Sequence, residues 1–132
     1  MKPPCMLITT HVLPAVRVIV AKDLVKVHEL KPVRVASKMG LTPAAVTQYV
    51  SGVRGGKMVD TLQRSEKIRQ VLDRLTMELL KPESDIYVAM PMVCELCKIV
   101  REEHMLCHMC GLSREREHCD VCSVVPACLT ER

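Results

Sequence analysis

Paired cysteines dominate the end of this chain and limit what that part can fold into. The last 39 of the 132 residues hold seven of the eight cysteines, six of them in three Cys-x2-Cys pairs. A pair with this spacing directs two sulfur atoms at one point, and thiolates arranged so bind zinc or iron–sulfur clusters. A module of about 50 residues without Phe or Trp buries little apolar area, so a bound metal is expected to supply most of its folding free energy.

The spacing of the cysteines does not determine which metal they bind. The first two pairs, separated by nine residues and followed by Gly111, have the spacing of a zinc ribbon. Seven thiolates are one short of two tetrathiolate zinc sites; alternatively, four of them hold one 4Fe–4S cluster, or all serve as a metal-free thiol switch. The candidate metal ligands are Cys94, Cys97, Cys107, Cys110, Cys119, Cys122 and Cys128. An eighth ligand could come from His104, His108 or His118.

The sign of the net charge changes near the start of the cysteine-rich part. Residues 1–81 hold 14 Lys and Arg against 6 Asp and Glu, a net charge of +8, whereas residues 82–132 hold 5 against 9. The basic part suits a polyanionic partner. Since no apolar run is long enough for a signal peptide or a membrane span, we expect a cytoplasmic protein without a membrane partner. The reducing cytosol disfavours disulfides, which leaves metal or redox chemistry for the cysteines.

Apolar periodicity predicts helices through the basic part. Helices are expected over 12–30, 32–39, 43–51 and 59–80. Pro14 fits the first turn of the first helix, Gly40 ends the second, and Thr42-Pro43 is a typical helix start, with Thr as the N-cap. Residues 83–93 are expected to link these helices to the cysteine module, and Cys5, near an unstructured end, is expected to be a bystander.

Residues 32–51 have the pattern of a helix-turn-helix. Such a motif needs a small residue where its helices cross and a residue tolerant of positive φ at the turn; Ala36 and Gly40 meet these needs. Apolar residues are placed to face the core: Val35, Met39, Leu41, Val46 and Tyr49. The remaining positions of the second helix are small or polar, and such side chains can enter the major groove of DNA.

Over about residues 12–80 the chain resembles the Cro/repressor (XRE-type) helix-turn-helix. The resemblance implies that 32–39 is the supporting helix and 43–51 the recognition helix. We expect the DNA contacts to come from Arg34, Lys38, Thr42, Pro43, Ala44, Thr47, Gln48, Ser51, Arg54 and Lys57. Gln48 is the best candidate to contact adenine, while the flanking basic residues would contact phosphate.

A stripe on the last predicted helix suggests a homodimer. Ile68, Leu72, Leu75 and Leu79 follow the 4-3-4 spacing of a helix–helix seam. A two-fold protein matches a palindromic operator in double-stranded DNA, which favours this interpretation. The alternative is that this face packs on the helix-turn-helix of its own chain.

The whole architecture is similar to a group of prokaryotic, chiefly archaeal, regulators that carry an iron–sulfur cluster. The expected fold is mainly α: a helix-turn-helix DNA-binding domain of four to five helices plus a small metal-stabilised cysteine-rich module. The expected parts are a tail (1–11), the DNA-binding domain (12–57), a long helix for packing or dimerisation (58–82) and the metal-binding module (83–132).

The likeness implies a transcriptional regulator whose 4Fe–4S cluster senses redox state, oxygen, iron or sulfur. The alternative is a zinc-stabilised DNA-binding or transcription adaptor protein, with one or two Zn²⁺ in a purely structural role. The sequence has no nucleophile elbow, phosphate loop, HExxH motif or carboxylate pair. We therefore expect neither an enzyme nor a small-molecule substrate.

Overall fold

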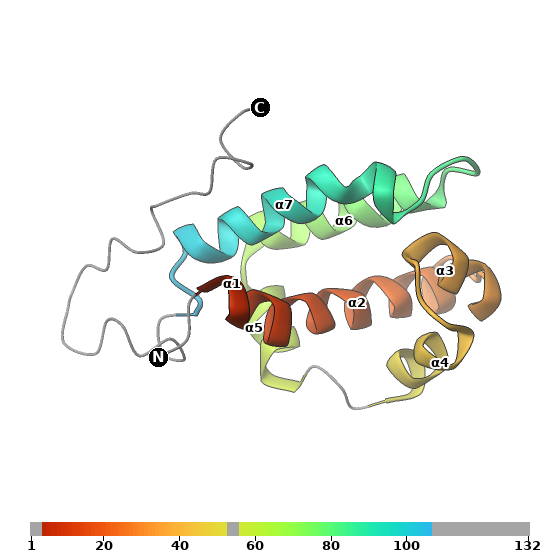
Figure 1. The fold of residues 1–132 in the computed structure, drawn as a ribbon, viewed down its shortest axis with the longest axis horizontal. Helices are drawn as coiled ribbons and strands as arrows, with labels where there is room; N and C mark the ends of the chain where they lie inside the picture. The colour runs from red at the N-terminus through yellow and green to blue at the C-terminus, as the bar shows by residue number, and fades with distance from the viewer. Residues whose placement is uncertain (1–3, 53–55, 107–132) are drawn as a thin grey trace.

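A computed structural model describes residues 4–52 and 56–106 of the chain (Figure 1). The elements, with η for a π-helical turn, are α1 (Pro4–Leu7), η1 (Ile8–Val12), α2 (Leu13–Lys22), η2 (Asp23–Val27), α3 (Pro32–Met39), α4 (Pro43–Ser51), α5 (Gly56–Arg64), α6 (Glu66–Leu80) and α7 (Ile86–Glu102). Every element within these ranges is helical, which confirms the expected mainly α class.

The helices form two layers (Figure 1). The antiparallel pair α6 and α7 lies over the run of α1 and α2, while α3 and α4 gather at the far end of α2. The core between the layers is aliphatic, and its largest fully buried side chains are leucine, isoleucine and valine. Since the chain has no Phe or Trp, these small side chains must fill the interior by close interdigitation.

The first helix is longer than its sequence pattern predicts. The elements α1, η1, α2 and η2 follow one another without a break over residues 4–27. Pro14 lies inside this run, where proline lacks the N–H that an α-helix needs; the turn before it is π-helical, with the N–H of Leu13 donating to the carbonyl of Ile8. Leu7 and Ile8 are buried. The expected tail over 1–11 is therefore wrong for residues 4–11.

The predicted pair of helices around Gly40 is confirmed with its expected bounds. Gly40 has a φ of 66°, and the N–H of Leu41 donates to the carbonyl of Ala36 at 2.9 Å, which closes α3. Thr42 is the N-cap of α4, and its Oγ1 accepts from the N–H of Ala45 at 3.1 Å. The small residue Ala36, predicted to lie where the two helices cross, is buried.

The residues expected to form one helix over 59–80 are helical, but they form two helices and not one, because Ser65 separates α5 from α6. The Oγ of Ser65 accepts from the N–H of Ile68 at 3.4 Å, as an N-cap does, and donates to Oε1 of Glu103 at 3.0 Å. A serine at this position can satisfy the free N–H groups of a new helix start, which apolar periodicity alone does not reveal.

Helix α7 occupies most of the expected linker. Asp85 caps it, with Oδ1 accepting from the N–H groups of Tyr87 and Val88 at 3.0 and 3.1 Å. Its buried side chains, which are chiefly Ala89, Val93, Leu96 and Val100, join the same core as the preceding helices. The linker expected over 83–93 is therefore wrong from Ile86 onward.

The proposed dimer seam is also wrong. Ile68, Leu72, Leu75 and Leu79 are at most 3% exposed, and they belong to the core that α6 shares with α2 and α7. The spacing does mark a helix–helix contact, but the partner helices come from the same chain. A face buried in this way is closed to a second copy.

Two hydrogen bonds of the Lys38 side chain connect α3 to the turn between α6 and α7. The side chain is 6% exposed, and Nζ donates to the carbonyl of Lys81 at 2.7 Å and to that of Ser84 at 3.2 Å. Burial lowers the pKa of this ammonium, the nearby Arg34 lowers it further, and Asp85 opposes both. The prediction that Lys38 contacts phosphate is wrong, because the group is committed to carbonyls inside the protein.

Replacing Lys38 tests how much these two hydrogen bonds stabilise the fold. Lys38→Met keeps the aliphatic stem but leaves both carbonyls without their charged donor, so we expect the free energy of unfolding to fall by about 1.5–3 kcal/mol. Urea unfolding measures it. The matched control is Lys67→Met, on the exposed side of α6, which should change it by less than about 0.5 kcal/mol. Equal losses in the two variants would show that the contact of Lys38 does not stabilise the fold.

Candidate nucleic-acid interface and thiol pair

The side chains predicted for base contact lie together on the open face of α4. All six are exposed: Thr42, Pro43, Ala44, Thr47, Gln48 and Ser51. The opposite face of α4 packs on α2 and α3 through Val46, which is fully buried. This division follows from the sequence, since the large apolar side chains of α4, which are Val46, Tyr49 and Val50, are the ones that pack on the core.

The polar groups of this face differ in what they can offer a ligand. The hydroxyl of Thr47 donates to the carbonyl of Pro43 at 3.0 Å, and that of Ser51 donates to the carbonyl of Thr47 at 2.8 Å. Both hydroxyl protons are therefore used inside the helix. Gln48 makes no hydrogen bond within the described residues, so its amide can both donate and accept. Gln48 is thus the side chain best suited to read a base edge.

Two exposed basic residues lie on the helices that precede and follow α4 in the chain, Arg34 on α3 and Lys57 on α5. Of the other two predicted phosphate contacts, Lys38 is buried and Arg54 lies outside the described residues. Helix α4 itself carries no charged residue. No charge on α4 itself therefore opposes the helix dipole, which favours an anion at the N-terminus of the helix.

The first cysteine pair lies within a helix and not in a loop. Cys94 and Cys97 belong to α7, one turn apart, and both are half-buried. Residues three apart on a helix are neighbours on its surface, so the two thiols can serve one site. The other five predicted ligands, Cys107, Cys110, Cys119, Cys122 and Cys128, lie outside the described residues. Residues 4–52 and 56–106 contain no group of three or more side chains placed to hold a metal.

His104, one of the candidate eighth ligands, lies beyond the end of the helix that carries Cys97. Helix α7 ends at Glu102, and His104 follows it in the left-handed conformation with a φ of 55°. The N–H of His104 donates to the carbonyl of Arg101, and that of Met105 to the carbonyl of Val100, which is the usual closure of a helix by a left-handed residue. His108 and His118 lie outside the described residues.

The surroundings of Cys97 favour the neutral thiol. Burial raises the pKa of Cys97 to about 11; the neighbouring Cys94 also raises this pKa, and Arg101 opposes the shift. Arg101 is 9% exposed, and its Nε has no partner among the described residues. Arg101 was not among the predicted site residues, although its position four residues after Cys97 places it on the same side of a helix.

Alkylation of Cys97 should report this environment. Below a pKa of about 11, the thiolate fraction rises with pH, so the alkylation rate of Cys97 in metal-free protein should increase about tenfold per unit between pH 7 and 9. Arg101→Met removes the cation that favours the thiolate and should slow the reaction at any one pH. Mass spectrometry of the iodoacetamide-labelled peptide measures the rate. An alkylation rate that does not change with pH between 7 and 9 would contradict the raised pKa of Cys97.

Comparisons of the chain with known protein families, with curated proteins and with solved structures find no match. The interpretation of the site therefore depends on its own geometry. No helix within the described residues is both long enough and apolar enough to cross a membrane.

Proposed function

We propose that the chain is a sequence-specific DNA-binding transcriptional regulator whose C-terminal cysteines bind a 4Fe–4S cluster that senses redox state, oxygen, iron or sulfur. One observation carries the DNA-binding part: the helix pair around Gly40 presents an uncharged, exposed face of α4 with Gln48 free at its centre. An α-helix with such a face fits the major groove, where glutamine can pair with both hydrogen-bonding groups of adenine.

The charge around α4 supports the same proposal. Arg34 and Lys57 are exposed on the elements before and after it, and residues 1–81 have a net charge of +8. Such cations add affinity that does not depend on sequence, while α4 would supply the discrimination. Two copies are proposed to bind a palindromic operator, and their contact must use a surface other than the buried face of α6.

The metal-binding part is supported by the thiols of α7. Cys94 and Cys97 can supply two ligands to one metal centre, and the guanidinium of Arg101 would offset negative charge on the bound thiolates. The remaining thiolates would come from the cysteines beyond residue 106. A cluster held in this way would supply a reversible change of charge and a sensitivity to oxidants.

A path from the thiols to α4 supports a sensing role. Helix α7 begins beside the turn between α3 and α4: a Cβ atom placed on Gly40 would lie 3.7 Å from Cγ2 of Ile86. Cys94 follows eight residues later on the same helix, roughly 12 Å along its axis. Because α7 is packed along α6 and Lys38 ties α3 to the turn before α7, a shift of α7 would be transmitted to the helix pair.

The DNA-binding part is tested with an operator selected from random sequences. Gln48→Ala should cost roughly 1–3 kcal/mol on this operator and relax the base preference at one position. Gln63→Ala, an exposed glutamine on α5, is the control and should leave the affinity unchanged. Fluorescence anisotropy measures both. An unchanged affinity for Gln48→Ala would show that α4 does not read DNA in this register.

The basic residues have a different expected effect. Arg34→Ala and Lys57→Ala should each weaken binding to the operator and to unrelated DNA alike, because phosphate contacts carry no sequence information. Each should also flatten the plot of log affinity against log salt by about one unit. If either variant changed only the affinity for the operator, that residue would be contacting a base edge instead.

Metal analysis of anaerobically purified protein tests the cluster. We expect a brown protein with broad absorption near about 400 nm, containing iron and acid-labile sulfide. Cys97→Ser should reduce the iron content strongly, whereas Cys5→Ser, which changes a thiol outside the proposed ligand set, should not. Colourless protein that contains zinc would contradict the cluster and favour the structural-metal alternative.

A further inference from the structure

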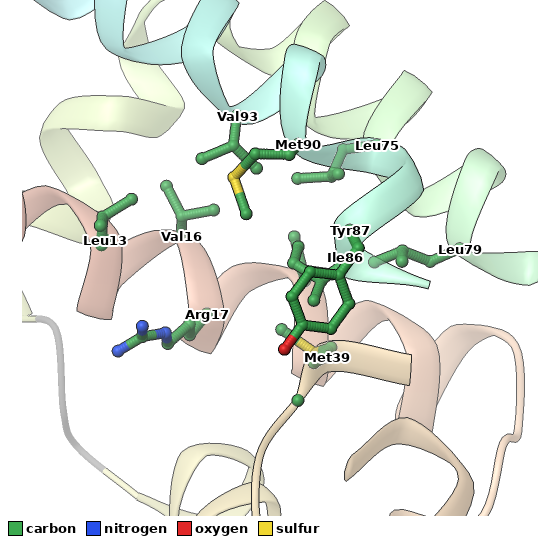
Figure 2. A pocket seen from close by; sticks show the side chains of 12 residues that line it. Leu13, Val16, Arg17, Met39, Leu75, Leu79, Ile86, Tyr87, Met90 and Val93 are labelled. Atoms are coloured by element: carbon green, nitrogen blue, oxygen red, sulfur yellow. The ribbon is translucent and has the colours of Figure 1, made fainter. Parts of the chain in front are cut away.

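An apolar pocket lies where α7 crosses above α2 beside the turn of the helix pair. It encloses about 230 Å³. Figure 2 shows its walls: Val16 from α2, Leu75 and Leu79 from α6, and Ile86, Met90 and Val93 from α7. An apolar cavity of about 150 Å³ is enough to admit benzene, so this one can hold a somewhat larger organic molecule.

A cation lies at the rim of the pocket. Among the residues that the structure describes, Arg17 is the only charged one that lines it, and this exposed side chain forms no ion pair with any of them. In Figure 2 Arg17 and the hydroxyl of Tyr87 lie on different sides of the group of apolar side chains, and the guanidinium of Arg17 points away from them. An arginine can bind a carboxylate through two parallel hydrogen bonds. The rim therefore suits a single negative charge.

The part of α7 around the opening is more apolar than an exposed helix surface needs to be. Tyr87, Val88 and Met90 are 79%, 58% and 40% exposed. Clustered exposed apolar side chains commonly mark a surface that binds something. Two of the three, Tyr87 and Met90, also line the pocket, so an occupant would cover part of this surface.

We propose that this pocket binds a small amphipathic monocarboxylate. Its apolar body, of roughly six to nine carbon atoms by comparison with the benzene-sized cavity, lies among the side chains of α2, α6 and α7. Its carboxylate pairs with Arg17. Met39 and Gly40 also line the pocket, so the occupant contacts the turn between α3 and α4.

The test uses octanoate, below its micelle concentration, and the full chain labelled with ¹³C in the methionine methyl groups. Octanoate should shift the signals of Met39 and Met90 in a saturable manner, because both side chains line the pocket. Met77, exposed on α6 and outside the pocket, should not shift. 1-Octanol, which has the same tail without the charge, should bind at least about tenfold more weakly, some 1.4 kcal/mol.

A matched pair of variants separates the pocket from general adsorption. Arg17→Gln should weaken octanoate binding about tenfold and leave octanol binding unchanged, whereas Arg64→Gln, an exposed arginine on α5, should change neither. Absence of saturable shifts at Met39 and Met90, equal shifts at Met77, or unchanged octanoate binding in Arg17→Gln would each overturn the proposal. No DNA is present, so failure here leaves the proposed DNA binding untouched.

Discussion

The packing of α6 against both α2 and α7 is the contact on which the rest of the structure depends. The apolar stripe of α6 is almost fully buried between these helices. Each such leucine or isoleucine contributes about 1.5–3 kcal/mol by leaving water. Without Phe or Trp in the chain, no single large side chain can replace this contact, so the two layers are held together by many small ones.

The same packing places the proposed sensor and the proposed reading face on one continuous body. Helix α7 starts beside Gly40, lies along α6 and carries Cys94 and Cys97 in its second half. Lys38 adds a polar fastening from α3 to the carbonyls before α7. The two halves that charge and cysteine content separate in the sequence are therefore joined in space, at least as far as residue 106.

Local rules made part of this fold predictable from the sequence. Gly40 and Thr42 determine the helix ends around the turn by their own chemistry, namely tolerance of positive φ and side-chain capping, so both bounds were predicted correctly. Ser65 and Asp85 cap helices in the same way, but neither is followed by a proline, which marks the helix start after Thr42. The split of α5 from α6 and the start of α7 were missed for this reason.

The part of the candidate site that could be predicted is the part where the spacing of apolar residues along a helix shows which side chains are exposed. The open face of α4 was predicted because apolar residues occupy its other positions. The burial of Lys38 could not be predicted, since it depends on carbonyls 43 and 46 residues away in the sequence. The burial of the α6 stripe against α7 also required knowing that residues 86–102 are helical, because the same spacing serves a contact within or between chains.

The central claim is that the metal-bound thiols control DNA binding through α7. The most direct measurement is an anaerobic titration of one selected operator with metal-loaded and with metal-stripped protein. The account predicts affinities that differ at least about tenfold, some 1.4 kcal/mol, with a smaller difference on unrelated DNA. Equal operator affinities would contradict it and would leave the cysteines a purely structural role.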